Sequence, residues 1–183
     1  MFKLGHFVDG VWSQYSHPAI FSVERNQTNE SKLLATAPRS DPAIFRALVN
    51  GLNPHLFLLY VLHTPRGEGK AGRYQSNSID HADFANFLSC FEDFFQSDSR
   101  FDLWAHSPAD RATIVWDRHD LIHVYGIVEH AVTALRGLGF QQGCPIINFV
   151  HQHYYHHEND ERAAQLLTAF DWNWSPLRSE DEQ

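Results

Sequence analysis

The chain has 183 residues, of which 43% are hydrophobic and 14% aromatic, and its net charge is −8. This size and apolar content suit one folded domain and exclude an intrinsically disordered chain, while the negative charge argues against nucleic-acid binding. Two cysteines, Cys90 and Cys144, are too few for a disulfide framework. The first residues contain no apolar core of the length of a secretion signal, and the longest apolar run, residues 56–62, is too short to span a membrane. We therefore expect a cytoplasmic protein with reduced thiols and no membrane contact.

The first half of the chain predicts strands and one helix. Asp41 can accept hydrogen bonds from the free N–H groups of a helix start, and Pro42 suits the first helical position. Apolar residues then recur on one helical face until Asn50 and Gly51 end the pattern. Strands are expected at residues 19–23 and 32–37, which form a hairpin around a polar turn at residues 26–30, and at residues 55–63 and 73–77.

The second half predicts three more helices and further strands. Asp80 is the expected N-cap of a helix whose phenylalanine stripe continues to Phe95 and faces the core. Asn159 is the expected cap of the last helix, which continues to Phe170. The remaining elements are a short strand at residues 101–105, a hairpin formed by residues 112–116 and 121–125, a helix over residues 127–138 and a strand over residues 146–155.

These elements follow the order β-β-α-β-β-α-β-β-β-α-β-α, in which hairpins alternate with helices. The order predicts an α+β fold, a mostly antiparallel sheet of about six to eight strands packed by about four helices. No Gly/Ser/Pro-rich linker divides the chain, so residues 1–178 are expected to form a single globular domain. The polar, acidic residues 179–183 are expected to form a frayed tail.

A histidine cluster near the end of the last predicted strand is the strongest candidate site. In a strand, His151, His153 and His157 share one face, and histidines two residues apart can chelate zinc or another transition metal. In a helix, His153 and His157 would share a face instead. Glu158 or Asp160 is the candidate base that activates a metal-bound water. Two alternatives remain: a metal-free acid–base site, or histidines that only bond to the backbone and water.

Two weaker candidates lie elsewhere. The glycine-rich loop over residues 64–72 can present N–H groups to an anion or a phosphorylated ligand, with charge from Arg66, Lys70 and Arg73. It lacks the glycine and the hydroxyl residue of a P-loop, and a plain surface loop is the alternative. Cys144 precedes the histidine strand and is a candidate nucleophile on proximity alone.

The charge of the chain is unevenly distributed. Residues 1–75 hold 8 Lys/Arg and 5 Asp/Glu, whereas residues 76–183 hold 6 and 17. The leading hypothesis is a non-enzymatic binding protein whose acidic surface meets a basic protein or a small ligand. Its expected contact residues are Trp104, Trp116, Asp117 and Asp120, although buried tryptophans and a merely solvated acidic surface are the alternatives. A metal-dependent enzyme such as a hydrolase is the second hypothesis, and anion binding by the glycine-rich loop is the third.

Overall fold

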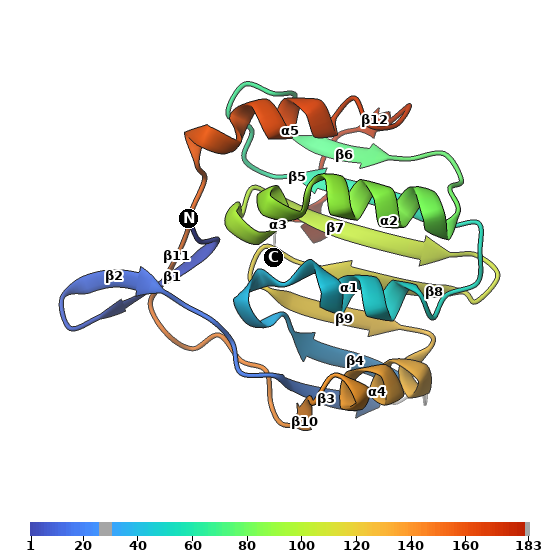
Figure 1. Ribbon diagram of the computed structural model, residues 1–183, viewed down its shortest axis with the longest axis horizontal. Coiled ribbons are helices and arrows are strands. Elements are labelled where there is room, and N and C mark those ends of the chain that lie inside the picture. The colour runs from blue at the N-terminus through green and yellow to red at the C-terminus, as the bar shows by residue number, and fades with distance from the viewer. Residues whose placement is uncertain (26–30, 182–183) are drawn as a thin grey trace.

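A computed structural model describes residues 1–25 and 31–181, and it confirms the predicted α+β class. Within these residues, nine strands form a main sheet, and the helices α1 to α5 lie over one of its faces (Figure 1). The sheet is antiparallel throughout except at one edge, where β10 pairs in parallel with β3. The polar turn predicted at residues 26–30 lies outside the described residues.

The main sheet contains the hairpins that the sequence predicts, together with short edge strands that it does not. β8 and β9 have the predicted bounds, whereas β10 and β12 are additional and contain two and three residues. In spatial order the strands are β10 (Gln141–Gln142), β3 (Ile20–Arg25), β4 (Ser31–Thr36), β9 (Leu121–Tyr125), β8 (Ala112–Trp116), β7 (Phe101–Ser107), β5 (Phe57–Leu62), β6 (Gly72–Gln75) and β12 (Asn173–Ser175).

A second, smaller sheet projects from one end of the main sheet (Figure 1). It consists of β11 (His151–His153), β1 (Leu4–Val8) and β2 (Val11–Gln14), in that spatial order and all antiparallel. Sequence analysis predicted neither β1 nor β2. It also expected a strand over residues 146–155, of which the structure forms only β11.

The helices begin largely where their caps predict. The Asp41 carboxylate accepts a hydrogen bond from the Ala43 N–H (2.9 Å), and Asp80 accepts one from Asp83 (2.8 Å). The expected single helix ending at Phe95 divides at Phe91, whose φ of −110° and ψ of 18° are not helical. The helices are α1 (Pro42–Val49), α2 (His81–Cys90), α3 (Glu92–Ser97), α4 (Val128–Gly137) and α5 (Asp160–Leu166).

The hydrophobic core lies between the helices and the covered face of the main sheet. Aromatic rings from α1, α3, β7 and β8 meet there at edge-to-face and tilted angles, and Trp116 is completely buried. None of the described helices has the length and the apolar character needed to cross a lipid bilayer.

The C-terminal segment does not fray as far as the sequence suggested. Residues Ser179–Asp181 form a 3-10 helix, and Asp181 is only 4% exposed. Its carboxylate binds the Arg73 guanidinium at 2.6 Å and accepts the Arg178 N–H. The ion pair between Asp181 and Arg73 thus anchors residues 179–181, although their polar composition had predicted a frayed tail.

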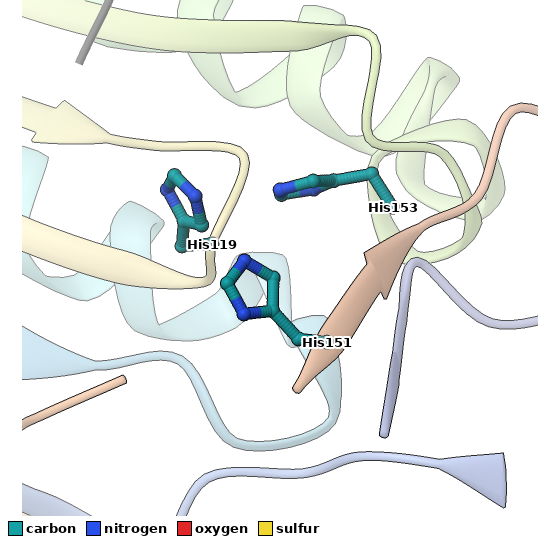
Figure 2. Close-up of side chains that lie close together, drawn as sticks. All are labelled: His119, His151 and His153. Atoms are coloured by element: carbon teal, nitrogen blue, oxygen red, sulfur yellow. The ribbon is translucent and has the colours of Figure 1, made fainter. Parts of the chain in front are cut away.

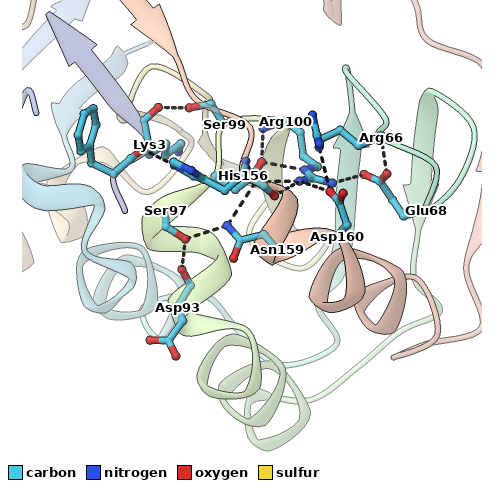
Figure 3. Close-up of polar contacts among 12 residues, drawn as sticks. Lys3, Arg66, Glu68, Asp93, Ser97, Ser99, Arg100, His156, Asn159 and Asp160 are labelled. Carbon is cyan, nitrogen blue, oxygen red and sulfur yellow. Dashed lines mark hydrogen bonds and ion pairs between the residues drawn. The ribbon is translucent and has the colours of Figure 1, made fainter. Parts of the chain in front are cut away.

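A buried guanidinium joins three loops at one end of the molecule (Figure 3). Arg100 is fully buried and makes paired hydrogen bonds to Asp98 at 2.8 and 2.9 Å. It also donates to Glu68 of the glycine-rich loop (2.9 Å) and to Asp160 at the start of α5 (3.0 Å). A bidentate, charge-assisted arrangement of this kind is strong and geometrically specific.

We expect Arg100→Met to destabilise the protein by about 3–5 kcal/mol, because Asp98 and Glu68 would remain buried without a countercharge. Urea denaturation measures this loss. Arg136→Met, on the exposed side of α4, is the matched control and should change stability by less than about 0.5 kcal/mol. Equal effects of the two substitutions would contradict the assignment.

The same network should make stability sensitive to acid. Burial raises the pKa of Asp160, but hydrogen bonds from Arg66 and Arg100 outweigh it and hold the pKa below its ordinary value. A depressed carboxylate pKa stabilises the fold above the unfolded value of about 4, and this contribution disappears as the pH falls through the folded value. The stability difference between wild type and Asp160→Asn should therefore shrink as the pH is lowered, which urea midpoints from about pH 6 to about pH 3 would show.

Candidate metal centre

Three histidines, two from one strand and one from a distant turn, converge between the two sheets (Figure 2). His151 and His153 extend from β11 toward His119, which lies in the turn between β8 and β9. One nitrogen of each ring lies within 4.8 Å of one nitrogen of each of the others. The ring centroids are 4.7 to 5.5 Å apart and the planes are steeply inclined, so the rings do not stack.

The alternation of a β-strand places His151 and His153 on the same face, as the sequence predicted. β11 pairs with β1, where Leu4 lies opposite His153 and His6 lies opposite His151. The Tyr154 N–H, directly after β11, donates to the Lys3 carbonyl at 3.0 Å. The position of the two histidines therefore depends on β1.

Lys3 connects β1 to the turn that carries His119. Its ammonium group is completely buried and donates to the Asp120 carboxylate (2.9 Å) and the Asp117 carbonyl (3.1 Å). It also lies 4.5 Å from the centre of the Trp116 ring, a favourable cation–π distance. Asp120 accepts further hydrogen bonds from Ser40 and from the Trp116 indole.

Two of the predicted partner-binding residues are therefore buried in the interior. Trp116 has no exposed surface and Asp120 is 3% exposed, so neither can contact a partner. This part of the prediction was wrong. Aromatic and acidic residues in a hairpin are typical of a binding surface, but here Lys3 packs against Trp116 and pairs with Asp120 in the interior. Trp104 and Asp117 keep part of their surface accessible.

Asp117 orients His119 from within the turn. One carboxylate oxygen accepts the backbone N–H of His119 (2.9 Å), and the other lies 3.8 Å from His119 Nδ1 and 3.3 Å from His123 Nε2. Burial raises the pKa of Asp117, but the two histidines outweigh it and hold the pKa far below its usual range. The carboxylate is therefore ionised, and it fixes the His119 backbone while its charge lies 3.8 Å from the imidazole that could bind a metal.

The rings of His151 and His153 each also have a nitrogen that is available to bind a metal ion. The Nδ1 of His151 lies 3.1 Å from the Phe149 carbonyl, which requires a proton on that nitrogen and leaves Nε2 as the free donor atom. Burial, with the nearby His119 and His151, lowers the pKa of His153 to about 3. His153 is thus neutral at physiological pH, and its buried Nδ1 has no hydrogen-bond partner among the described residues. Neutral imidazole is the form that binds metal ions.

The geometry fits a tetrahedral transition-metal ion. Zinc binds histidine nitrogen at about 2.0–2.1 Å, so its ligand nitrogens lie about 3.3 Å apart. The three nitrogens lie within 4.8 Å of one another, so they would need to approach by at most about 1.5 Å to reach this spacing. Imidazole ligands also suit copper, nickel and iron, so the ligand set favours transition metals over magnesium or calcium.

The other predicted members of this site lie apart from it. His157 is in a 3-10 helix after β11, where it pairs with Glu158 at 3.0 Å, and both side chains are more than half exposed. Asp160 binds Arg66 and Arg100. Cys144 is exposed, and none of the described contacts joins it to a histidine. The predicted strand ends at His153, so the alternation that would have carried His157 to the same face does not continue.

The basic residues of the glycine-rich loop do not converge on a common anion. Arg66 pairs with Asp160, and Arg73 pairs with Asp181 while its guanidinium lies 5.3 Å from the Trp104 ring. Lys70 lies 5.7 Å from the Trp174 ring. Each cation thus has a partner of its own, an arrangement that gives no support to an anion-binding loop.

Sequence reasoning missed His119 as a ligand because it lies 32 positions before His151. Its own surroundings indicated only a hairpin turn, in which aspartate is common for backbone reasons. Comparisons of the chain with family models, with curated proteins and with solved structures found no match.

The carboxylate of Asp117 should matter for metal affinity without contacting the metal. We expect Asp117→Asn to weaken zinc binding by about 10-fold, because it removes the negative charge 3.8 Å from His119 Nδ1, and partners of ligating histidines typically contribute about 10- to 100-fold. Competition with a chromophoric chelator measures the change, with circular dichroism confirming the fold. Asp110→Asn, on the exposed turn between β7 and β8, is the control and should leave the affinity unchanged.

Proposed function

We propose that this protein binds a transition-metal ion, zinc in the first instance, through His119, His151 and His153, and that it uses the ion for hydrolytic chemistry. The observation that carries the proposal is the convergence of three imidazole nitrogens within 4.8 Å from two separate elements. A neutral His153 with an unpartnered buried nitrogen supports it, since such a group is costly unless a ligand satisfies it.

The number of ligands favours a catalytic site over a structural one. Structural zinc sites are closed by four protein ligands, whereas catalytic sites have three and keep a position for water. Within the described residues, the metal-binding group contains three side chains. A zinc ion in such a site lowers the pKa of its bound water to about 7 and supplies a hydroxide nucleophile.

A binding protein with an acidic surface remains the alternative proposal. Its support is the net charge of −8, concentrated in the second half of the chain. Two of its four proposed contact residues, Trp116 and Asp120, are buried, and a third, Asp117, pairs with His119 and His123. The metal proposal is preferred because its three residues converge, whereas two of the four proposed contact residues are buried.

The direct test is the metal content of protein purified without a histidine tag. We expect about one equivalent of zinc or another transition metal per chain, and the double variant His151→Ala/His153→Ala should lose it. His119→Ala should lose it as well, because it removes the ligand that only the tertiary structure supplies. Elemental mass spectrometry after dialysis provides the measurement.

His157→Ala is the matched control, since this histidine belongs to the same sequence cluster but lies outside the converging group. It should retain the metal at wild-type stoichiometry. Metal loss in His157→Ala, or metal retained in folded His119→Ala, would overturn the assignment of ligands. A wild-type protein that takes up no metal when offered zinc, cobalt or nickel would overturn the proposed function itself.

A further inference from the structure

A buried histidine from the loop between β2 and β3 contacts the turn that carries His119. This residue, His17, is 4% exposed, and its Nε2 lies 2.9 Å from the His119 carbonyl oxygen. A carbonyl oxygen only accepts hydrogen bonds, so Nε2 carries a proton and donates it. His17 therefore binds the backbone of a metal-binding histidine and leaves its ring free.

This hydrogen bond completes a pair that holds both peptide groups of His119. The backbone N–H of His119 donates to the Asp117 carboxylate (2.9 Å), and its carbonyl accepts from His17. Because peptide groups are planar, fixing both of them leaves the imidazole only its side-chain torsions. Asp117 belongs to the same turn, whereas His17 lies 102 positions earlier in the chain. His17 thus ties the turn to a distant segment.

The loop that carries His17 is itself fixed to the main sheet and its surroundings. The Thr36 hydroxyl, in β4, donates to the Pro18 carbonyl at 2.6 Å. On the other side of His17, the Arg39 N–H donates to the Ser16 hydroxyl at 3.0 Å. The residues that flank His17 are therefore anchored, which gives its imidazole donor a defined position.

Two aromatic rings connect His17 to a second metal-binding histidine. The Tyr15 ring meets the His17 ring edge to face, with centroids 4.8 Å apart, and lies 4.2 Å from the Phe149 ring. These separations are close to those typical of aromatic pairs. The Phe149 carbonyl accepts the hydrogen bond from His151 Nδ1 at 3.1 Å. A continuous series of contacts therefore leads from His119 through His17, Tyr15 and Phe149 to His151.

This connection complements the one that Lys3 makes. Lys3 fixes where the turn lies relative to the small sheet. His17 fixes His119 within that turn and reaches His151 through Tyr15. Both are needed because a metal site requires its ligands to lie within about 0.5 Å of their productive positions.

We propose that His17 is a positioning residue of the metal centre, which holds His119 and His151 at the spacing that the ion requires. This inference rests on the proposed metal binding but not on the proposed reaction. A hydrogen bond with a purely structural role would stabilise the fold without changing metal affinity. His81 supplies the comparison, since its Nε2 donates to the Leu52 carbonyl at 3.0 Å from the start of α2, outside the metal-binding group.

The experiment measures zinc affinity by competition with a chromophoric chelator, and the visible absorption of cobalt(II) bound in place of zinc. Four-coordinate cobalt(II) absorbs much more strongly than six-coordinate cobalt(II), so the spectrum reports the geometry of the site. His17→Leu removes the donor and should weaken zinc binding about tenfold and reduce the cobalt absorption. His17→Gln offers an amide N–H near the position of Nε2 and should bind zinc within about threefold of wild type.

His81→Leu is the matched control. It should lower the urea midpoint about as much as His17→Leu does, because each substitution removes one hydrogen bond from an imidazole to a carbonyl. Its zinc affinity and cobalt spectrum should remain those of the wild type.

Tyr15 supplies an independent variant if His17→Leu does not fold. Tyr15→Ala removes the ring contacts with His17 and Phe149 and should also weaken zinc binding about tenfold. Tyr15→Phe keeps the ring and should bind zinc as the wild type does.

The hydrogen bond itself is tested without any metal. Nitrogen–proton correlation spectra of the imidazole rings in metal-free protein should show a proton on His17 Nε2. A proton on Nδ1 alone would overturn the contact with His119, and with it the inference, whether or not the protein binds zinc.

The outcomes separate this inference from the proposed function. If the wild type binds zinc, an unchanged affinity in folded His17→Leu, or an equal loss in His81→Leu, would overturn the positioning role and leave the metal proposal standing. A loss in His17→Gln as large as that in His17→Leu would overturn it as well, since the retained donor would then have no effect. A wild type that binds neither zinc nor cobalt would overturn the proposed function and the inference together.

Discussion

The buried guanidinium of Arg100 is the interaction on which the geometry of this end of the molecule depends. It binds Asp98 and Glu68, both almost completely buried, together with Asp160 and the His156 carbonyl. These partners come from the glycine-rich loop, the turn before β7 and the segment after β11. Removing the guanidinium would strongly destabilise the fold, because the Asp98 and Glu68 carboxylates would remain buried without a countercharge. The cluster thereby fixes the path of the chain as it leaves the histidine strand.

A second buried cation, Lys3, connects the small sheet to the main sheet. It is held by Asp120 and the Asp117 carbonyl and lies against the Trp116 ring. His119 lies between these two aspartates in the same turn, while β1 carries β11 beside it. One ion pair thus sets the distance between His119 and the two strand histidines. A metal centre assembled from two sheets needs such a connection, because ligands that are displaced by about 1 Å bind poorly.

A cavity of about 140 Å³ on the uncovered face of the main sheet adjoins the metal-binding histidine His119. Trp104, Val115 and His123 form a row across three strands, and Asp117 contacts both His123 and His119. The metal-binding group and the cavity therefore share a side chain and a supporting carboxylate. The C-terminal segment, anchored by the pair between Asp181 and Arg73, completes one wall of the cavity. Segments from both ends of the chain thus contribute to a single region.

The sequence by itself determined the fold class, the hairpins and most helix starts, because these depend on local signals such as the carboxylate caps Asp41 and Asp80 and the alternation along β8 and β9. It also placed His151 and His153 on one face, which follows from strand geometry alone. Only the tertiary structure decided that His119 joins them and His157 does not. It also decided that Trp116 and Asp120 are interior and that residues 179–181 are anchored. These outcomes depend on contacts between residues far apart in the chain, chiefly those of Lys3, Arg73 and Arg100. The ion pairs of these residues follow no periodicity or fixed spacing along the chain, so the sequence pattern does not reveal them.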